Sequence, residues 1–219
     1  MSDLAITTFP VAPLGCNCSI VVHKPTGDAI VVDPGGEAPR IIQTLTEQNA
    51  KVRWIIHTHA HFDHCLGTRE VAEHARSAQV ETEAPIVAMH KRDLGLYRML
   101  DVQCGWFGLP AQKAEEEIAH HLEDQETIEF GGRKMEVLHT PGHTPGSCCF
   151  HLPEDGVIFS GDTLFARGIG RTDLPGGDSD AIFRSIKNRL FTLEDETAVV
   201  PGHGQLTRIY EERTQNPFF

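Results

Sequence analysis

Long apolar runs are absent from this chain of 219 residues. No stretch approaches the roughly 20 apolar residues that a membrane-spanning helix requires, so we expect no membrane partner. The first 15 residues also lack the basic start and the continuous apolar segment of a secretion signal, which predicts a protein that is not exported. Basic residues are few: 19 Lys and Arg stand against 31 Asp and Glu, a formal net charge of -12. Because such a surface repels phosphate groups, we expect no nucleic-acid partner.

The cysteines contain no C-x-x-C motif. The six are scattered along the chain: Cys16, Cys18, Cys65, Cys104, Cys148 and Cys149. Neighbouring members of this set lie too close in sequence to bridge each other easily, and no export signal is present. We therefore expect free thiols and a cytoplasmic location.

The composition is otherwise that of an ordinary globular protein. Hydrophobic residues make up 40% of the chain and charged residues 23%, which excludes a disordered protein. A chain of this length can bury its apolar side chains in one core, so we predict that residues 1–219 form a single domain. The exception is histidine, with 13 residues, and where these residues cluster is the main clue to function.

Hydrophobic periodicity predicts two similar halves. Strands are predicted in the first half at residues 4–9, 18–23, 29–33, 52–56 and 86–89, and in the second half at 127–130, 134–139, 147–151, 157–160 and 198–200. Helices are predicted at 37–49, around 71–75 with an end before Pro85, and at 182–190, with a helical insertion near 91–123. This α/β pattern is best satisfied by two mixed sheets packed face to face with helices outside.

A dense group of metal-ligand residue types follows the strand at 52–56. It consists of His59, His61, Asp63 and His64. In extended backbone, side chains two apart point the same way, so His59 and His61 can bind one ion together. Asp63 and His64 come where the chain turns into the next helix, so they can face a second ion. Packing alone does not explain three imidazoles and a carboxylate within six positions.

Three more candidate ligands lie at later strand ends. His143 stands in a turn rich in Pro and Gly, Asp162 follows an apolar strand, and His203 stands in Pro201-Gly202-His203-Gly204 after the last strand. Each is weak evidence alone. Together they complete seven nitrogen and oxygen ligands that a rigid scaffold would present on one rim.

The order His-x-His-x-Asp-His, His, Asp, His resembles the metallo-β-lactamase superfamily, which implies an αββα sandwich with a metal site at one edge. Within it, the all-His/Asp set is similar to glyoxalase II (hydroxyacylglutathione hydrolase). The resemblance implies one metal on His59, His61 and His143, a second on Asp63, His64 and His203, and Asp162 as the bridge. It also implies that Asp33 supports the ligands by hydrogen bonds, although an ordinary Asp-Pro-Gly turn is the alternative.

Two divalent ions at such a site generate a hydroxide at neutral pH and polarise a substrate oxygen. We expect zinc, with iron or manganese as alternatives, and we assign Asp63 and Asp162 as the catalytic carboxylates. Attack of a metal-bridging hydroxide suits a thioester, because a leaving thiol with a pKa near about 8.5 needs no separate general acid. The predicted substrate is a small-molecule thioester, S-(2-hydroxyacyl)glutathione.

Substrate recognition rests on one residue. Arg171 matches a basic position that glyoxalase II offers to a glutathione carboxylate, although a loop-stabilising ion pair is the alternative. Two aromatic positions of the family are Asp173 and Gln205 here, and the family's helical C-terminal domain has no counterpart after His203. The ending instead resembles short bacterial glyoxalase-II-like proteins. The oligomeric state, the acyl group and the role of the insertion near Trp106 stay open.

The chief alternative is a persulfide dioxygenase of the same superfamily. It would hold a single iron on His59, His143 and Asp162 and act on glutathione persulfide. The intact second trio favours the two-metal hydrolase. An alternative of another class is a non-enzymatic metal-binding protein, but all seven ligands are retained. A β-lactamase is disfavoured because Asp162 stands where common zinc lactamases place cysteine, and a nuclease because the charge opposes it and the chain leaves no room for an RNA-gripping domain.

Overall fold

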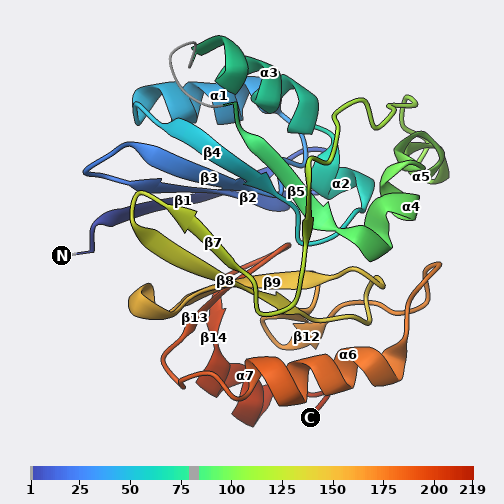
Figure 1. The fold of residues 1–219 in the computed structure, drawn as a ribbon. Coiled ribbons are helices and arrows are strands. Elements are labelled where there is room, and N and C mark those ends of the chain that lie inside the picture. Colours follow the sequence, from blue (N-terminus) through green and yellow to red (C-terminus); the bar gives the residue numbers. More distant parts are fainter. Residues whose placement is uncertain (1, 79–83) are drawn as a thin grey trace.

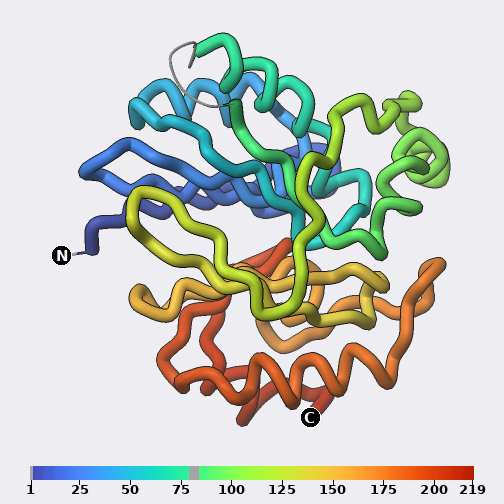
Figure 2. Tube along the Cα trace, in the orientation of Figure 1, coloured from blue at the N-terminus to red at the C-terminus, as the bar shows by residue number. Residues whose placement is uncertain are grey.

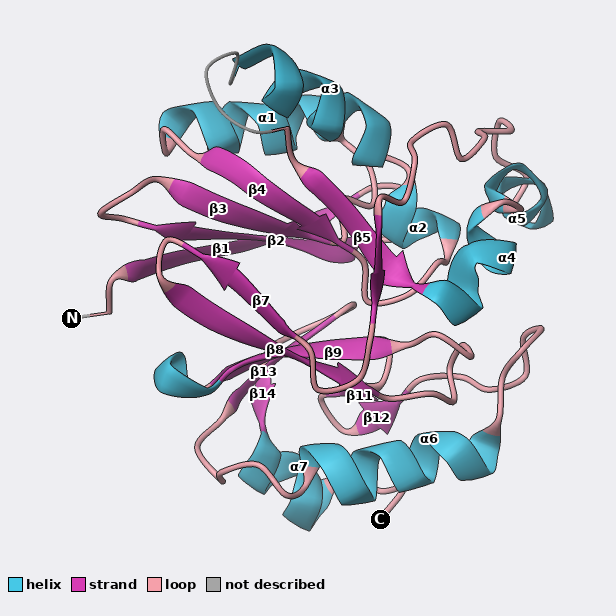
Figure 3. Ribbon diagram, viewed as in Figure 1, coloured by secondary structure: helices cyan, strands magenta, loops and turns pink. Residues whose placement is uncertain are grey.

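The computed structural model describes residues 2–78 and 84–219. Two six-stranded sheets pack face to face, with helices on both outer surfaces (Figure 1; Figure 3). This arrangement confirms the predicted αββα sandwich. The Cα trace shows the blue-to-green half of the chain stacked on the yellow-to-red half (Figure 2). None of the helices in the described part of the chain has the length and apolar character needed to cross a membrane.

The first sheet follows the order of the sequence. Its strands are β1 (Leu4–Val11), β2 (Cys16–His23), β3 (Asp28–Val32), β4 (Lys51–Ile56), β5 (Ile86–His90) and β6 (His120–Leu122). The first three pair antiparallel and the pairs from β3 to β6 are parallel. Strands in parallel pairs are often buried on both faces, and their sequences are then continuous apolar runs. The burial of β3 is an example.

The second sheet has the order β14-β13-β10-β9-β8-β7. Its strands are β7 (Thr127–Phe130), β8 (Arg133–His139), β9 (Cys148–Leu152), β10 (Val157–Gly161), β13 (Ala198–Pro201) and β14 (Thr207–Arg208). Only β10 and β13 pair in parallel. A small separate hairpin joins β11 (Leu164–Phe165) to β12 (Gly168–Ile169).

Helices cover the two outer faces. Helices α1 (Ala38–Glu47) and α3 (Thr68–Ala78) lie on the first sheet, and α6 (Ser179–Ser185), its π-helical continuation η3 (Ile186–Leu190) and α7 (Ile209–Gln215) lie on the second (Figure 1). Short helices stand at one edge of the sandwich: α2 (Phe62–Cys65), η1 (Lys91–Asp93), α4 (Leu94–Tyr97) and α5 (Leu100–Trp106). The turn η2 (Pro153–Asp155) joins β9 to β10.

The main core lies between the two sheets. Ile30 and Ile56 from the first sheet meet Met135, Phe150 and Phe159 from the second. Burying one such side chain fully contributes about 1.5–3 kcal/mol, so this shared layer ties the sheets into one unit. The strand ends at its edge are held in place by both halves.

Two sequence predictions need correction or extension. The insertion expected to be helical over 91–123 is helical only as far as Trp106, and its last residues form β6 in the first sheet. No helix was predicted after His203, yet α7 packs Ile209 into the outer core of the second sheet. The predicted continuation of α3 toward Pro85 reaches residues 79–83, which lie outside the described residues.

Candidate metal centre

The candidate ligands lie where strands end at one edge of the sandwich. The loop after β4 carries His59 and His61, and α2 carries Asp63 and His64. The backbone is extended at His61 and becomes helical at Phe62, so the predicted change of side-chain direction occurs there. The turn between β8 and β9 carries His143. The ends of the parallel neighbours β10 and β13 carry Asp162 and His203, respectively.

Three imidazoles converge in the first group. The Nε2 atoms of His59 and His143 lie 3.1 and 2.9 Å from Nδ1 of His61. All three side chains are buried. Three ring nitrogens directed at one point cannot all be paired by hydrogen bonds to one another, whereas a cation would accept a lone pair from each. Nitrogens bound to a tetrahedral zinc at about 2.0–2.1 Å are separated by comparable distances.

A second group stands beside the first. His203 Nε2 lies 3.1 Å from Asp63 Oδ2 and 3.3 Å from His64 Nε2. The Asp162 carboxylate lies between the groups, with Oδ1 3.5 Å from His64 Nε2 and Oδ2 3.6 Å from His143 Nε2. The structure therefore brings together all seven residues predicted as ligands, in the two predicted trios with the bridging carboxylate between them.

The residues present fit metal ions. Asp162 Oδ1 is buried and has no hydrogen-bond partner among the described residues. A buried carboxylate oxygen without a partner is costly unless a charge compensates it. Gly202 allows the chain to pass directly against this site, because a methyl group there would clash with the Asp162 carboxylate and the His64 ring. The donor set is the mixture of imidazole and carboxylate that zinc, iron and manganese accept.

Burial and neighbouring charges keep two of the imidazoles neutral and Asp63 ionised. Burial, aided by the surrounding histidines, holds the pKa of His59 well below its usual range and lowers the pKa of His61 to about 3. Both rings are therefore neutral and keep a lone pair for an ion. Burial alone would raise the pKa of Asp63, but the neighbouring His64 and a hydrogen bond from His203 lower it to about 2. Asp63 is thus an anionic ligand at every ordinary pH.

Asp33 orients two of the rings. Its backbone sits at the end of β3 with a φ of 49°, a conformation that Asp tolerates better than most residues. Its Oδ2 lies 3.0 Å from His64 Nδ1 and accepts from the Thr58 hydroxyl at 2.6 Å. The Thr58 oxygen in turn lies 3.0 Å from His59 Nδ1. Asp33 therefore holds the outer nitrogens of both rings, as such supporting carboxylates do around metals.

Comparison with known proteins decides the family. The model of the metallo-beta-lactamase superfamily matches residues 11–203. The chain belongs to the metallo-beta-lactamase superfamily. The Haemophilus influenzae protein named hydroxyacylglutathione hydrolase GloC is 35% identical to it over 97% of each chain.

Solved members of the superfamily have the same fold. The BLEG-1 B3 metallo-beta-lactamase superimposes with a TM-score of 0.87 at 32% identity, covering 98% of this chain and 99% of that one. The protein TTHA1623, solved in a di-iron-bound form, superimposes with a TM-score of 0.83 at 35% identity, covering 97% and 100%.

Asp93, a buried carboxylate beside the candidate ligands, was not predicted from the sequence. It is fully buried at the end of η1. Its Oδ2 accepts from the Ala60 amide at 3.0 Å and the Thr144 hydroxyl at 2.7 Å, and its Oδ1 accepts from the Gly146 amide at 2.6 Å. Asp93 therefore joins the loop of His59 and His61 to the turn of His143.

Gln103 was missed in the same way. This α5 side chain is buried, accepts from the Phe62 amide at 3.1 Å, and donates to the Ala60 carbonyl at 3.1 Å. It thus fastens the start of α2 to the insertion. Neither Asp93 nor Gln103 stands near a ligand in sequence, and each lies in a short helix with several exposed residues, so no local pattern marks it as buried.

Cys16, Cys65 and His57 also lie near the cluster, but none of them was predicted as a ligand. Cys16 Sγ lies 3.4 Å from His64 Nδ1, on the ring atom opposite the one that faces Asp63 and His203. Burial raises the pKa of the Cys16 thiol to about 12, and burial raises that of Cys65 well above its usual range. Both stay protonated. His57 is buried beneath the site, and burial lowers its pKa to about 4.

Arg171 contributes to the site by its backbone. Its carbonyl lies 2.7 Å from His143 Nδ1 and accepts the proton of that nitrogen, which directs Nε2 toward the cluster. Its side chain is exposed and forms two contacts of 2.7 Å with Asp173. This is the ion pair considered as the alternative in the sequence analysis, so the guanidinium is already paired.

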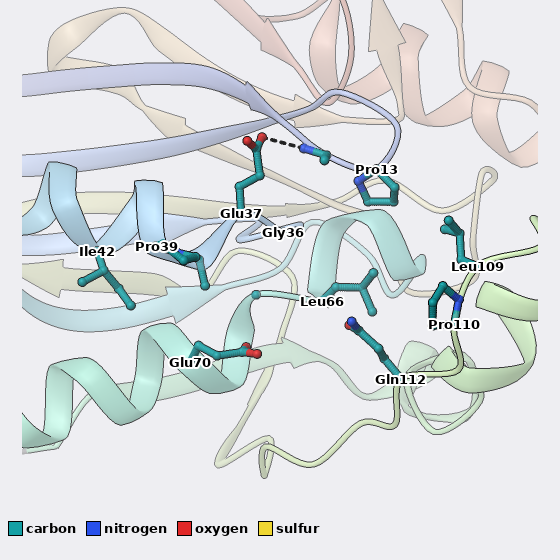
Figure 4. A pocket seen from close by; sticks show the side chains of 13 residues that line it. Pro13, Gly36, Glu37, Pro39, Ile42, Leu66, Glu70, Leu109, Pro110 and Gln112 are labelled. Carbon is teal, nitrogen blue, oxygen red and sulfur yellow. Dashed lines mark hydrogen bonds between the residues drawn. The ribbon is translucent and has the colours of Figure 1, made fainter.

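The cluster opens into a cavity of about 160 Å³. One part of its lining carries the candidate ligands His61, Asp63, His143, Asp162 and His203. Another part, called the apolar wall below, carries Leu14, Trp106, Phe107 and Leu174. A second cavity of about 530 Å³ lies between α1, the start of α3 and the segment at 109–112 (Figure 4). Its described lining is mainly apolar, with Glu37, Glu70 and Gln112, and includes none of the seven candidate ligands.

Proposed function

We propose that this chain is a dinuclear metal-dependent thioester hydrolase. Its substrate would be S-(2-hydroxyacyl)glutathione, and its products glutathione and a 2-hydroxy acid. The single observation that carries the proposal is the convergence of two ligand trios on the shared carboxylate of Asp162. The relative named hydroxyacylglutathione hydrolase GloC supports the choice of substrate.

In this proposal the ligands divide as the sequence analysis predicted. His59, His61 and His143 would hold one ion, Asp63, His64 and His203 would hold the other, and Asp162 would contribute to both. We propose zinc, with iron as the first alternative because TTHA1623 was solved with two irons. When bound, the ions acidify a water molecule and polarise the carbonyl of the substrate.

The chain's own residues prepare this reaction. Asp33, through His64 and Thr58, and the Arg171 carbonyl, through His143, keep the ring nitrogens directed at the cluster. Asp63 and Asp162 supply the two carboxylates that the proposal treats as catalytic. Water would give up a proton and add to the carbonyl carbon, the carbon–sulfur bond would break, and the sulfur would leave as a thiolate that takes up a proton from solvent, which yields the acid and glutathione. Since a thiol with a pKa near about 8.5 leaves readily as the anion, no further acid is required.

The six cysteines support a cytoplasmic location for this enzyme. All six are free and buried, and unpaired thiols are typical of proteins that work in a reducing compartment.

The decisive experiment is hydrolysis of S-D-lactoylglutathione by the purified protein, measured as loss of thioester absorbance. The protein is first stripped with a chelator and then reloaded with Zn²⁺, Fe²⁺ or Mn²⁺ at counted stoichiometry. We expect turnover above about 1 per second, with two ions per chain. No turnover with any metal would overturn S-D-lactoylglutathione as the substrate.

Two control assays distinguish the alternatives. Oxygen consumption with glutathione persulfide and one iron per chain would identify the dioxygenase of the sequence analysis. Hydrolysis of a chromogenic β-lactam would identify a lactamase, an activity named for the relative BLEG-1. A bound metal with no turnover in any assay would indicate a non-enzymatic metal-binding protein.

A further inference from the structure

The apolar wall of the metal-centre cavity exposes large side chains to solvent. Trp106 is 51% exposed, Phe107 49% and Leu14 46%. They come from two distant parts of the chain, α5 with the residue after it and the loop between β1 and β2. All three line the cavity that also contains Asp162 and His203. Exposed apolar groups gathered around a cavity mark a binding surface for an apolar group.

The wall is held rigidly on one side. The Phe107 ring packs against Phe62, with ring centroids 5.0 Å apart, and Phe62 is buried in α2 between His61 and Asp63. The same α5 is tied to the start of α2 by Gln103. The distance between the aromatic wall and the candidate ligands is therefore set by packed side chains and hydrogen bonds.

The dimensions of the cavity indicate which part of a thioester enters it. A cavity of about 160 Å³ is close to the size of an apolar cavity that holds one benzene molecule, roughly 150 Å³. The two ions of the proposed site would take up part of this space, and the part beside the apolar wall is left for the acyl group, while a glutathionyl group is much larger than the whole cavity. The thiol part must then extend outward past Arg171, whose guanidinium is exposed and paired with Asp173.

From this geometry we infer that Leu14, Trp106 and Phe107 form an acyl pocket that selects thioesters with an aromatic or bulky apolar acyl group. The inference rests on the proposed function and adds the substrate class. An aromatic acyl group would stack against Trp106 and Phe107 and cover the surface that water now contacts. The small methyl group of a lactoyl thioester would leave most of that wall exposed to water.

The test compares S-D-mandeloylglutathione with S-D-lactoylglutathione, which differ only by a phenyl group in place of a methyl group. Because the thiol is identical, the leaving group and the contacts outside the cavity cancel. We expect the metal-loaded enzyme to show a kcat/KM at least about tenfold higher for the mandeloyl thioester, because added contacts in an apolar pocket favour the substrate that fills it. Equal values, or a preference for the lactoyl thioester, would overturn the inference.

Variants locate the source of this preference. Trp106→Ala and Phe107→Ala should each lower the ratio of kcat/KM for the mandeloyl thioester to kcat/KM for the lactoyl thioester severalfold. Trp106→Phe should retain most of the preference, since it preserves an aromatic wall. Val102→Ala is the matched control, because Val102 is an exposed apolar residue of α5 outside the cavity. If Trp106→Ala lowered kcat/KM equally for both thioesters, Trp106 would serve folding and not substrate selection.

A binding measurement separates this inference from the proposed function. In a Trp54→Phe background, Trp106 is the only tryptophan, and its fluorescence reports on the wall directly. We expect S-benzylglutathione to bind more tightly than S-methylglutathione and to quench this signal, whether or not any thioester is hydrolysed. Tight benzyl binding without turnover would overturn the hydrolase and keep the pocket, whereas turnover with equal affinities would do the opposite.

Discussion

The candidate ligands and the other residues around the metal-centre cavity are built differently. Among the ligands, His59, His64 and His143 are buried, and the outer nitrogen of each ring contacts an oxygen of the protein. By contrast, Trp106 on the apolar wall and the side chain of Arg171 are exposed. A reaction at metal ions requires ligands placed accurately before substrate arrives, whereas a recognition surface can be half-exposed until it is covered. The difference predicts that changes to the ligands and the residues that hold them affect metal content and kcat, and that changes to the exposed residues affect KM.

The largest effect is expected from Asp162→Ala. This change removes the carboxylate that lies between the two trios. Removing a single oxyanion donor costs about 10²–10³ in kcat, and loss of a shared ligand should cost at least as much while weakening both ions. Metal analysis and the S-D-lactoylglutathione assay measure the two effects. Full activity in this variant would show that Asp162 is no bridge.

The next largest effect is expected from Asp93→Asn. All three contacts of this carboxylate come from donors, so an amide nitrogen in place of one oxygen would face a donor. The loops of His59 and His143 should separate, and metal affinity should fall about 10–100-fold, as for other residues that orient ligands.

A competition titration with a chelator measures the affinity of this variant. Asp101→Asn on α5 is the control, because Asp101 contacts only the amide of Val102. Unchanged affinity in Asp93→Asn would mean that the two loops hold their positions without this carboxylate.

A smaller effect is expected from Arg171→Ala. The backbone carbonyl that His143 contacts remains, so kcat and metal content should stay as they are. KM for a glutathione thioester should rise about two- to fivefold, in keeping with the weakness of exposed ion pairs. Steady-state kinetics separate the two parameters. A fall in kcat would place the side chain closer to the reaction than its exposure indicates.

The smallest effect, with the opposite sign, is expected from Asp173→Ala. A hydrogen bond from Arg171 lowers the pKa of Asp173 to about 2, so the pair persists at neutral pH. A substrate carboxylate must displace it, and its removal should lower KM by about twofold. In the double variant with Arg171→Ala this gain should vanish. A gain that survives would show that Asp173 repels the substrate directly.

Much of the fold followed from local patterns. Runs such as 29–32 and 157–159 are apolar because both faces of these strands are buried, and the strands that contain them were found at the predicted places, as was the one at 52–56. The insertion was less predictable, because His120–Leu122 forms a strand only by pairing with β5. Short edge strands carry too few residues for periodicity to identify them. Helix α7 likewise depends on packing against the second sheet.

The sequence by itself determined the identity of the candidate ligands, because seven His and Asp residues at strand ends follow the order of a known superfamily. The tertiary structure decided how they are held. Asp93 and Gln103 act through contacts with residues more than 30 positions away in sequence, and Trp106 and Asp162, from different halves of the chain, line the same cavity. Spacing along a strand reports which side chains share a face, but contacts between distant segments exist only once the two sheets have packed.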